Sequence, residues 1–388
     1  MVKDRRLLWV ISYHHACNDG TLMALVALLP ILFVDLGISY YEVGLLGLGL
    51  VITVVVQLAV GRIADRAFSK FLLEIGAGLM GLSFVLLLFV QDFTQLFIAV
   101  IAMRIGASFY HPVGISWITR EYAGSDLDDA LGVQSGIGNL GVIIAMASSG
   151  FLGEAFGWKT PCMLWAAMNL VAILAGMYVV KGHPKDSIVA AKKEPITIRQ
   201  TFNKMAMLTL PIATGGAIYQ VTSTFGPVNL TTVYGWSAGS ADLLFAIWIA
   251  VGTITSYYYG RLRERFGRYS LMKAGYGVSA LVTLALFFVS DWRITAPLLV
   301  VFGALLFLTY PALFAVVTDS TARGERGTAF GILFGFQLGG GAVVVYITGL
   351  VADMSGEPAW GFVIVSVMAA MSLAVVQLWE SDAPNRCP

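Results

Sequence analysis

Charged residues are scarce in this sequence. Asp, Glu, Lys and Arg make up 12% of its 388 residues, whereas a soluble protein carries about 25%. Hydrophobic residues make up 58%, and the mean hydropathy is +0.80. These values predict an all-α polytopic membrane protein. The net charge of +1 gives no reason to expect a nucleic-acid partner.

Cysteines and enzyme motifs are also lacking. The three cysteines, Cys17, Cys162 and Cys387, are far apart and include no C-x-x-C pair, so we expect free thiols. The sequence has no H-E-x-x-H, no G-x-S-x-G and no nucleotide-binding loop. We therefore predict that the protein is not an enzyme and holds no cofactor and no resident metal.

The sequence contains instead a series of long apolar runs. The first run is too long for a signal peptide and is predicted to remain as the first span. A polar, lysine-rich stretch separates two groups of six, so we predict an N-terminal six-helix bundle (1–180), a cytoplasmic linker (181–203) and a C-terminal six-helix bundle (204–388). The twelve predicted spans lie near 7–34, 42–61, 71–90, 93–118, 129–152, 160–180, 204–232, 240–260, 271–290, 294–318, 327–351 and 360–379.

Lys and Arg are distributed asymmetrically over the predicted loops. All but three of the 24 lie in the two termini or in alternate loops counted from the N-terminus. The exceptions are Lys159 and Arg293, on the opposite side, and Arg104, inside a span. The positive-inside rule then predicts that both termini and the central loop are cytoplasmic. We expect a monomeric, multi-pass protein of the cell (inner) membrane.

The two halves repeat each other at a displacement of 199 residues. Pro112 recurs as Pro311, and four glycines of span 5 recur in span 11. A shared displacement over several segments predicts parallel repeats with the substrate bound between them near the middle of the membrane. The other matches are Gly61-x-x-x-Asp65-Arg66 with Gly260-x-x-x-Glu264-Arg265, and Gly132, Gly136, Gly141 and Gly150 with Gly331, Gly335, Gly340 and Gly349.

The repeated Gly-x-x-x-acid-Arg loops, together with twelve spans, resemble the signature of the major facilitator superfamily. This resemblance implies two pseudo-symmetric six-helix bundles that work by alternating access. Proton antiporters of the superfamily commonly carry Gly-Pro in span 5, which this chain lacks, so the direction of transport stays open. Three motifs resemble the fosmidomycin-resistance branch of drug efflux proteins: His15-x-x-Asn18-Asp19, Ser108-Phe109-Tyr110-His111-Pro112 and Gly138-Asn139-Leu140-Gly141.

The first span carries the polar group on which the predicted site is centred. His15 and Asp19 are four residues apart and share a helical face, and Asn18 falls on the same stripe. A carboxylate inside a span costs at least about 2.5 kcal/mol and indicates a functional site by default. The alternative is a packing hydrogen bond to a neighbouring helix, worth about 0.6–2 kcal/mol.

A second polar group lies on the fourth span, where Arg104, Ser108 and His111 follow helical spacing. A helix rises about 1.5 Å per residue, so the depth of each residue below the cytoplasmic end of its span can be estimated. By this estimate His111 lies at the depth of His15, and Arg104 lies nearly at the depth of Asp19. We therefore predict an Asp19–Arg104 ion pair beside two histidines; the alternative for His111 is a bond that caps the Pro112 kink. Proton coupling is assigned to His15, Asp19 and His111, and substrate contact in this half to Asn18, Arg104, Ser108 and Asn139.

The C-terminal half has no acid or base at the matching depth, and Tyr310 takes the place of His111. We predict that this half shapes and hydrogen-bonds the substrate through Tyr219, Gln220, Tyr310 and Gln337.

The repeated loops are predicted to form a cytoplasmic gate in the outward-open state. The alternative is that their basic residues serve only as a topology signal. The gating residues are Asp65, Arg66, Glu264 and Arg265.

Three transport functions fit these features. The first is movement of a small organic solute, outward, against a proton gradient. The second is proton-linked transport or exchange of organic anions, which Arg104 would serve. The third is transition-metal transport, because His15, Asp19 and His111 form a possible ligand set. A non-transporting sensor would need neither the gate loops nor the charges inside the spans. The expected partners are the solute, protons and the lipid bilayer.

The orientation can be tested by cysteine labelling. A cysteine that replaces Lys192 should react with a membrane-impermeant thiol reagent only after the cells are permeabilised, because the central loop is predicted to be cytoplasmic. The matched control is Arg293→Cys, which should react in intact cells. Labelling of Lys192→Cys from outside would reverse the predicted topology.

Overall fold

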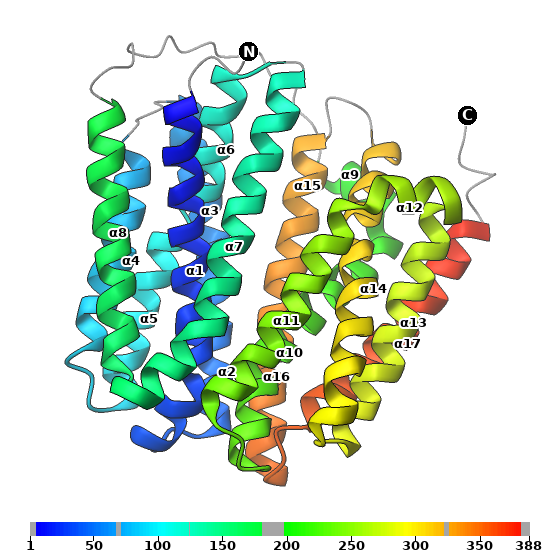
Figure 1. Cartoon of the computed structure of the whole chain (residues 1–388). Coiled ribbons are helices and arrows are strands. Elements are labelled where there is room, and N and C mark those ends of the chain that lie inside the picture. Colours follow the sequence, from blue (N-terminus) through cyan, green and yellow to red (C-terminus); the bar gives the residue numbers. More distant parts are fainter. Residues whose placement is uncertain (1–4, 67–70, 124, 181–197, 322–325, 382–388) are drawn as a thin grey trace. The chain divides into compact units, whose positions relative to one another are not determined.

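The computed structural model describes residues 5–66, 71–123, 125–180, 198–321 and 326–381, and these residues are almost entirely helical (Figure 1). Contacts divide the chain into two compact units. The first consists of Met1–Ile38, Gly49–Ala191 and Ser237–Ala246, and the second of Ser39–Leu48, Lys192–Trp236 and Ile247–Pro388. Each unit therefore includes one short helical segment from the other half of the sequence. Most of the linker predicted at 181–203 lies outside the described residues.

The first unit contains α1, α3 to α8 and the start of α11, and the second contains α2 and the remaining helices. The bounds are α1 Arg5–Asp35, α2 Tyr40–Leu48, α3 Leu50–Arg66, α4 Leu72–Leu87, α5 Phe93–Ala107, α6 Tyr110–Glu121, α7 Ser125–Phe156, α8 Lys159–Val180, α9 Ile198–Met205, the 3₁₀ turn η1 Ala206–Leu208, α10 Thr209–Thr232, α11 Ala238–Tyr257, α12 Tyr259–Phe266, α13 Arg268–Phe288, α14 Trp292–Asp319, α15 Arg326–Phe334, the π-helix η3 Gly335–Gly339, α16 Gly340–Ser355 and α17 Trp360–Ser381.

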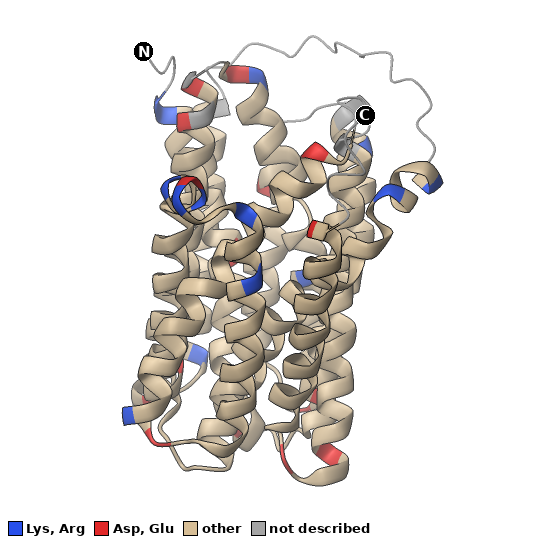
Figure 2. Ribbon diagram, turned by 90° about the vertical axis from the view of Figure 1, so that its right-hand side faces the viewer, with Lys and Arg blue, Asp and Glu red and all other residues tan. Residues whose placement is uncertain are grey.

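The helices match the predicted spans. Within the described residues, ten helical stretches are long and apolar enough to cross a membrane, and they correspond to ten of the twelve predicted segments. The other two segments contain α4, which has 16 residues, and α10, which has 24 residues and several Thr and Gly. Figure 2 shows Lys, Arg, Asp and Glu mainly near helix ends, with few charges in the middle turns. The predicted all-α polytopic fold is confirmed.

Glycines set the closest helix contacts in the first unit. A Cβ atom on Gly141 of α7 would overlap the backbone of Ala16 on α1, and one on Gly138 would overlap the ring of His15. On α1, a Cβ on Gly20 would lie 3.1 Å from the carbonyl oxygen of Gly141 and would overlap the ring of Trp165 on α8. Lipid tails are as apolar as Leu, so helices in a membrane associate by such close packing rather than by apolar burial. The α1–α7 contact therefore depends on these glycines.

The glycines related by the 199-residue repeat have equivalent surroundings. Gly141 faces α1, and its counterpart Gly340 faces α10. Gly150 receives the start of α11, and its counterpart Gly349 receives α2. The remaining pairs, Gly132 with Gly331 and Gly136 with Gly335, all face open space. The repeat predicted from the sequence is thus a repeat of helix contacts.

Two short segments, the start of α11 in the first unit and α2 in the second, pack with the other half of the sequence. Each is held by hydrogen bonds to a carboxylate near a helix end. Glu154 at the end of α7 accepts from the backbone N–H of Ala238 (2.5 Å) and of Gly239 (3.2 Å), and so caps the N-terminus of α11. In the second unit, Asp353 of α16 accepts from the backbone N–H of Tyr40 (2.8 Å) at the start of α2. Each carboxylate satisfies N–H groups that a helix N-terminus leaves without a helical partner.

The fourth span is not one continuous helix as predicted. α5 ends at Ala107 and α6 begins at Tyr110, with the Ser108 hydroxyl donating back to the carbonyl of Ile105 (2.6 Å). Pro112 lies in the first turn of α6, where its missing N–H leaves no bond unmade. Its repeat counterpart Pro311 lies inside the unbroken α14. The break matters for the site, because Arg104 and His111 belong to different helices.

The glycine contacts predict a difference in stability. Gly141→Ala should lower the Tm of the purified protein, because the new methyl group meets the backbone of α1. Gly136→Ala, on the same helix with open space around it, is the matched control. It should leave the Tm unchanged or raise it, since Ala favours a helix by about 1 kcal/mol over Gly. Equal effects of the two substitutions on thermal unfolding would mean that the α1–α7 contact adapts without cost.

Candidate functional site

Three side chains of the first unit form the cluster that the sequence indicated. His15 Nε2 lies 3.1 Å from one carboxylate oxygen of Asp19, and His111 Nε2 lies 3.6 Å from the other. The two imidazole rings stand edge to face with centroids 5.3 Å apart. The expectation that the histidines of spans 1 and 4 lie together is confirmed.

The ring of His15 is held from two sides. Its Nδ1 donates to the backbone carbonyl of Gln134 on α7 (2.9 Å), because a carbonyl oxygen can only accept. The ring of Tyr110 stacks on it with centroids 4.4 Å apart and 16° between the planes. The Tyr110 hydroxyl in turn donates to the side-chain oxygen of Gln134 (2.8 Å). These contacts fix both the position and the tautomer of His15.

The fixed tautomer has a chemical consequence. With the hydrogen on Nδ1, neutral His15 presents a lone pair at Nε2. A lone pair and a carboxylate oxygen 3.1 Å apart repel each other unless a proton lies between them. The contact is therefore favourable when His15 and Asp19 share one proton, as an imidazolium with a carboxylate or as an imidazole with a carboxylic acid.

Asn18 and His111 complete the surroundings of Asp19. The Asn18 amide donates to the Asp19 oxygen that faces His111 (2.8 Å). Asn18 is buried, whereas the His111 side chain is 39% exposed and that of Asp19 is 23% exposed. His111 is therefore the member of the cluster that solvent or a solute reaches most easily.

The cluster also has the composition of a metal site. Potential ligand atoms of His15, Asp19 and His111 all lie within 4.8 Å of one another. However, the Asn18 amide directs its hydrogens at the Asp19 carboxylate, and Nε2 of His15 already contacts the other oxygen. The contacts present are those of a pair that shares a proton.

The predicted Asp19–Arg104 ion pair is not formed, and this expectation was wrong. Asp19 pairs with the two histidines instead. The Nε atom of Arg104 is buried without a hydrogen-bond partner, while the Arg104 backbone carbonyl accepts from Thr53 (3.0 Å). The reason is the break after α5, because equal depth and helical spacing along a continuous span do not hold across it.

Two other candidates lie away from the cluster contacts. Ser108 is fully buried and bonded within its own turn. Asn139 is half-buried on α7, next to Gly138. Of the four substrate-contact candidates in this half, Asn18 alone is bonded to a member of the cluster in the part of the chain that the structure describes.

The candidates of the second unit form a separate group. Tyr219 and Tyr310 both pack against Phe307, with ring centroids 6.1 and 5.7 Å apart, and Tyr310 donates to the carbonyl of Gly215 (3.1 Å). Gln220 donates to the carbonyl of Leu338 (3.3 Å). Gln337 lies in the π-helix and its side-chain oxygen has no partner; such π-helical turns occur frequently at functional sites.

The predicted gating residues lie at helix ends. Asp65 and Arg66 end α3, and their side chains lie outside the described residues. Glu264 and Arg265 are exposed on α12, and Arg265 stacks over Phe266. The ion pair formed near this loop joins Arg268 to Asp319, a pairing that the sequence analysis did not anticipate.

Sequence reasoning missed four residues around the cluster. Tyr110 lay inside a quoted motif but was assigned no role. Gln134 lies one helical turn before Gly138 and so faces the same ring. His14 is buried on the side of α1 that faces α8, and Glu74 is buried on α4 near the same glycine of α8. A polar residue one turn from a conspicuous glycine was the one signal available for Gln134.

Comparison with known proteins agrees with this architecture. The family model described as Major Facilitator Superfamily matches residues 15–343 and 222–387. The chain is 24% identical over 361 residues to the fosmidomycin resistance protein of Escherichia coli, covering 89% of this chain and 86% of the relative. It is 24% identical over 376 residues to an MFS-type efflux pump of Mycolicibacterium smegmatis, covering 91% and 86%.

Solved structures show the same fold. A bacterial homolog of the human lysosomal transporter Spinster has a TM-score of 0.81 at 16% identity and covers 98% of both chains. The nucleoside transporter NupG has a TM-score of 0.78 at 16% identity and covers 97% of this chain and 98% of its own. The chain therefore belongs to the Major Facilitator Superfamily and is a multi-pass membrane transporter, not an enzyme.

Proposed function

We propose that the protein is a secondary transporter that moves a small organic solute outward in exchange for protons, by alternating access. The observation that carries this proposal is the contact between Nε2 of His15 and the carboxylate of Asp19. Because Nδ1 is committed to the Gln134 carbonyl, this contact favours the state that holds one proton. The cluster is thus a site that changes charge with the proton it binds.

Coupling follows if solute and proton oppose each other at this cluster. A solute that enters from the side of His111 approaches the more exposed part of the site. A donor group on the solute that bonds to Asp19 takes the place of the shared proton, and release of the solute restores it. Exchange requires that each occupant weaken the binding of the other.

The outward direction is supported by relatives. Two of them are named for fosmidomycin resistance and for efflux. In the second unit, the rings of Tyr219, Phe307 and Tyr310 suit the apolar part of a solute, and Gln220 and Gln337 suit its polar groups. The repeated loops, with Asp65 and Arg66 in one copy and Glu264 and Arg265 in the other, act as the cytoplasmic gate. Both termini face the cytoplasm, and the protein works as a monomer.

An organic anion is the second candidate solute. The observation that favours it is the buried, unpartnered Nε of Arg104, because a guanidinium group binds a carboxylate well. A thermal-shift screen of purified protein against drugs, carboxylates and divalent metals separates the candidates, since binding to the folded state raises the Tm. Stabilisation by carboxylates that Arg104→Ala abolishes would favour anion transport. Stabilisation by a divalent metal that both His15→Ala and His111→Ala abolish would overturn the proton assignment.

The coupling role of Asp19 can be tested in proteoliposomes with a solute from that screen. Asp19→Asn should abolish transport against a solute gradient driven by a pH gradient, because the amide cannot share the proton. Downhill exchange of labelled solute should persist, since the helix packing is unchanged. Glu121→Gln, an exposed acid at the end of α6, is the matched control and should behave as the parent does. Uphill transport by Asp19→Asn at the parent rate would make the cluster structural.

The tautomer argument makes a separate prediction for NMR of protein labelled with ¹⁵N-histidine. In Asp19→Asn, we expect His15 to show one protonated nitrogen, Nδ1, because the Gln134 carbonyl still holds that hydrogen. In the parent, the Nε2 signal should instead carry the shift of a nitrogen that shares a proton. His15→Gln identifies the signal. A parent Nε2 with the shift of a free lone pair would contradict the shared proton.

A further inference from the structure

Two adjacent histidines leave α1 on different sides. His15 faces α7, whereas His14 faces α8 and has a relative exposure of only 3%. The backbone of Ala172 on α8 lies near His14, and Nε2 of the His14 ring has no hydrogen-bond partner. In the tautomer with its hydrogen on Nδ1, neutral His14 presents a buried lone pair at Nε2.

A carboxyl group lies beside this lone pair. Glu74 of α4 is 8% exposed, and both of its carboxyl oxygens are buried without a hydrogen-bond partner. Gly176 of α8 makes room for both groups. A Cβ atom there would lie 3.0 Å from His14 Nε2 and would overlap an oxygen of Glu74. The absence of a side chain on Gly176 therefore leaves an acid and a base close together inside the bundle.

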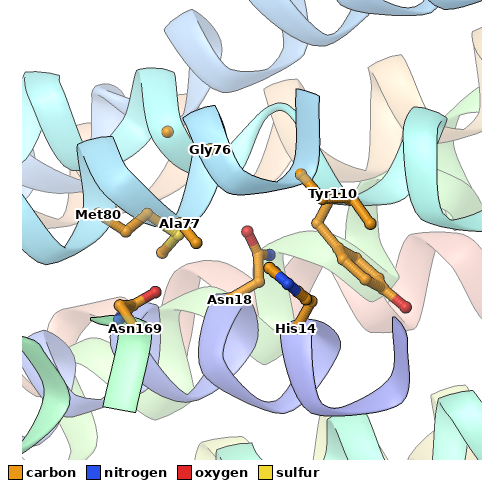
Figure 3. Close-up of a pocket in the computed structure, with 9 residues that line it drawn as sticks. His14, Asn18, Gly76, Ala77, Met80, Tyr110 and Asn169 are labelled. Atoms are coloured by element: carbon orange, nitrogen blue, oxygen red, sulfur yellow. The ribbon is translucent and has the colours of Figure 1, made fainter. Parts of the chain in front are cut away.

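A small cavity adjoins His14 (Figure 3). It is lined by His14 and Asn18 of α1, Tyr110 of α6 and Asn169 of α8, together with apolar residues and glycines of α4 and α5. The space available to water centres is about 10 Å³, which is room for about one water molecule. The side-chain oxygen of Asn169 is buried without a partner and can hold that water. His14 and Tyr110 are the titratable residues among those that line the cavity.

We propose that His14 and Glu74 form a second proton-binding site, buried in the first unit and separate from the His15–Asp19 pair. A proton taken up from bulk water binds the Glu74 carboxyl group near Nε2 of His14, and it leaves an acid and a base that are both uncharged. This removes the charge from a buried acid that has no counter-ion.

The site belongs to the same transport cycle, so this part of the inference rests on the proposed function. Asn18 lines the cavity and also donates to Asp19, which places the two sites on the two sides of one residue. Asn18 therefore lies between Asp19 and the cavity that His14 lines. With two sites, one transport cycle can move more than one proton.

The repeat supports a specific role for Glu74. Its counterpart 199 residues later is Lys273, which is paired with Glu380 (2.7 Å) near a helix end. The position thus has a satisfied charge in one half of the chain and an unsatisfied acid in the other. Packing at this position does not require an unpaired acid.

Infrared difference spectroscopy on the whole protein in detergent tests the site without any solute. The spectrum of the parent minus that of Glu74→Gln, at neutral pH, should show the loss of one protonated carboxyl band. In Asp19→Asn this band should remain. Glu121→Gln, an exposed acid, is the matched control and should lose an ionised carboxylate band. Loss of an ionised carboxylate band in Glu74→Gln would overturn the proposal.

A second variant covers the case in which Glu74→Gln does not fold. His14→Gln leaves the acid in place but removes the base, so the carboxyl band should shift and remain. An unshifted band would overturn the pairing of His14 with Glu74. In proteoliposomes, Glu74→Gln should lower the number of protons moved per solute, and an unchanged ratio would remove the site from the cycle. Failure of Asp19→Asn to lose coupled transport would instead reject the proposed function and leave the infrared result untouched.

Discussion

The close approach of α1 to α7 is the constraint on which the rest of the site depends. Gly141 lets the α7 backbone come against Ala16, and Gly138 leaves space for the ring of His15. At that distance the carbonyl of Gln134 can accept the His15 Nδ1 hydrogen. The same bond decides that Nε2, the atom facing Asp19, lacks a hydrogen of its own. The close packing of α7 on α1, which two glycines allow, therefore determines which nitrogen of His15 can bind a further proton.

The helix α1 is held in the same way on its other side. Residues next to each other on a helix point about 100° apart, so His14 turns toward α8 where His15 turns toward α7. His15 faces α7 and His14 faces α8, and an acid lies near Nε2 of each ring. Charges are expensive in a bilayer. Both pairs meet that constraint by placing a titratable base against an acid, so that a proton can neutralise them.

The sequence predicted the fold well and the site only in part. The apolar runs predicted the spans, because they depend on local composition, and the 199-residue displacement predicted the two parallel halves. His15, Asp19 and His111 were found from helical spacing and depth. The Asp19–Arg104 pair was wrong, because a break of two residues between α5 and α6 changes which faces meet. The roles of His14 and Glu74 could not be found, since they depend on which helix lies beside α1, and spacing along one span carries no information about that. Gln134 was missed although it lies one helical turn before Gly138.

The 199-residue repeat preserves the close contacts between helix backbones but not the titratable residues of the site. The glycines at 141 and 150 keep their surroundings at 340 and 349, while the acids and bases inside the spans are replaced. His15, Asp19 and Glu74 correspond to Thr214, Ile218 and Lys273. Thr214 is bonded to Ser372 within its own unit (2.8 Å), and Lys273 is paired. A helix contact that depends on a missing side chain tolerates little change, whereas a polar side chain can be replaced once its partners are replaced with it. The two bundles could therefore keep one architecture while proton chemistry concentrated in the first.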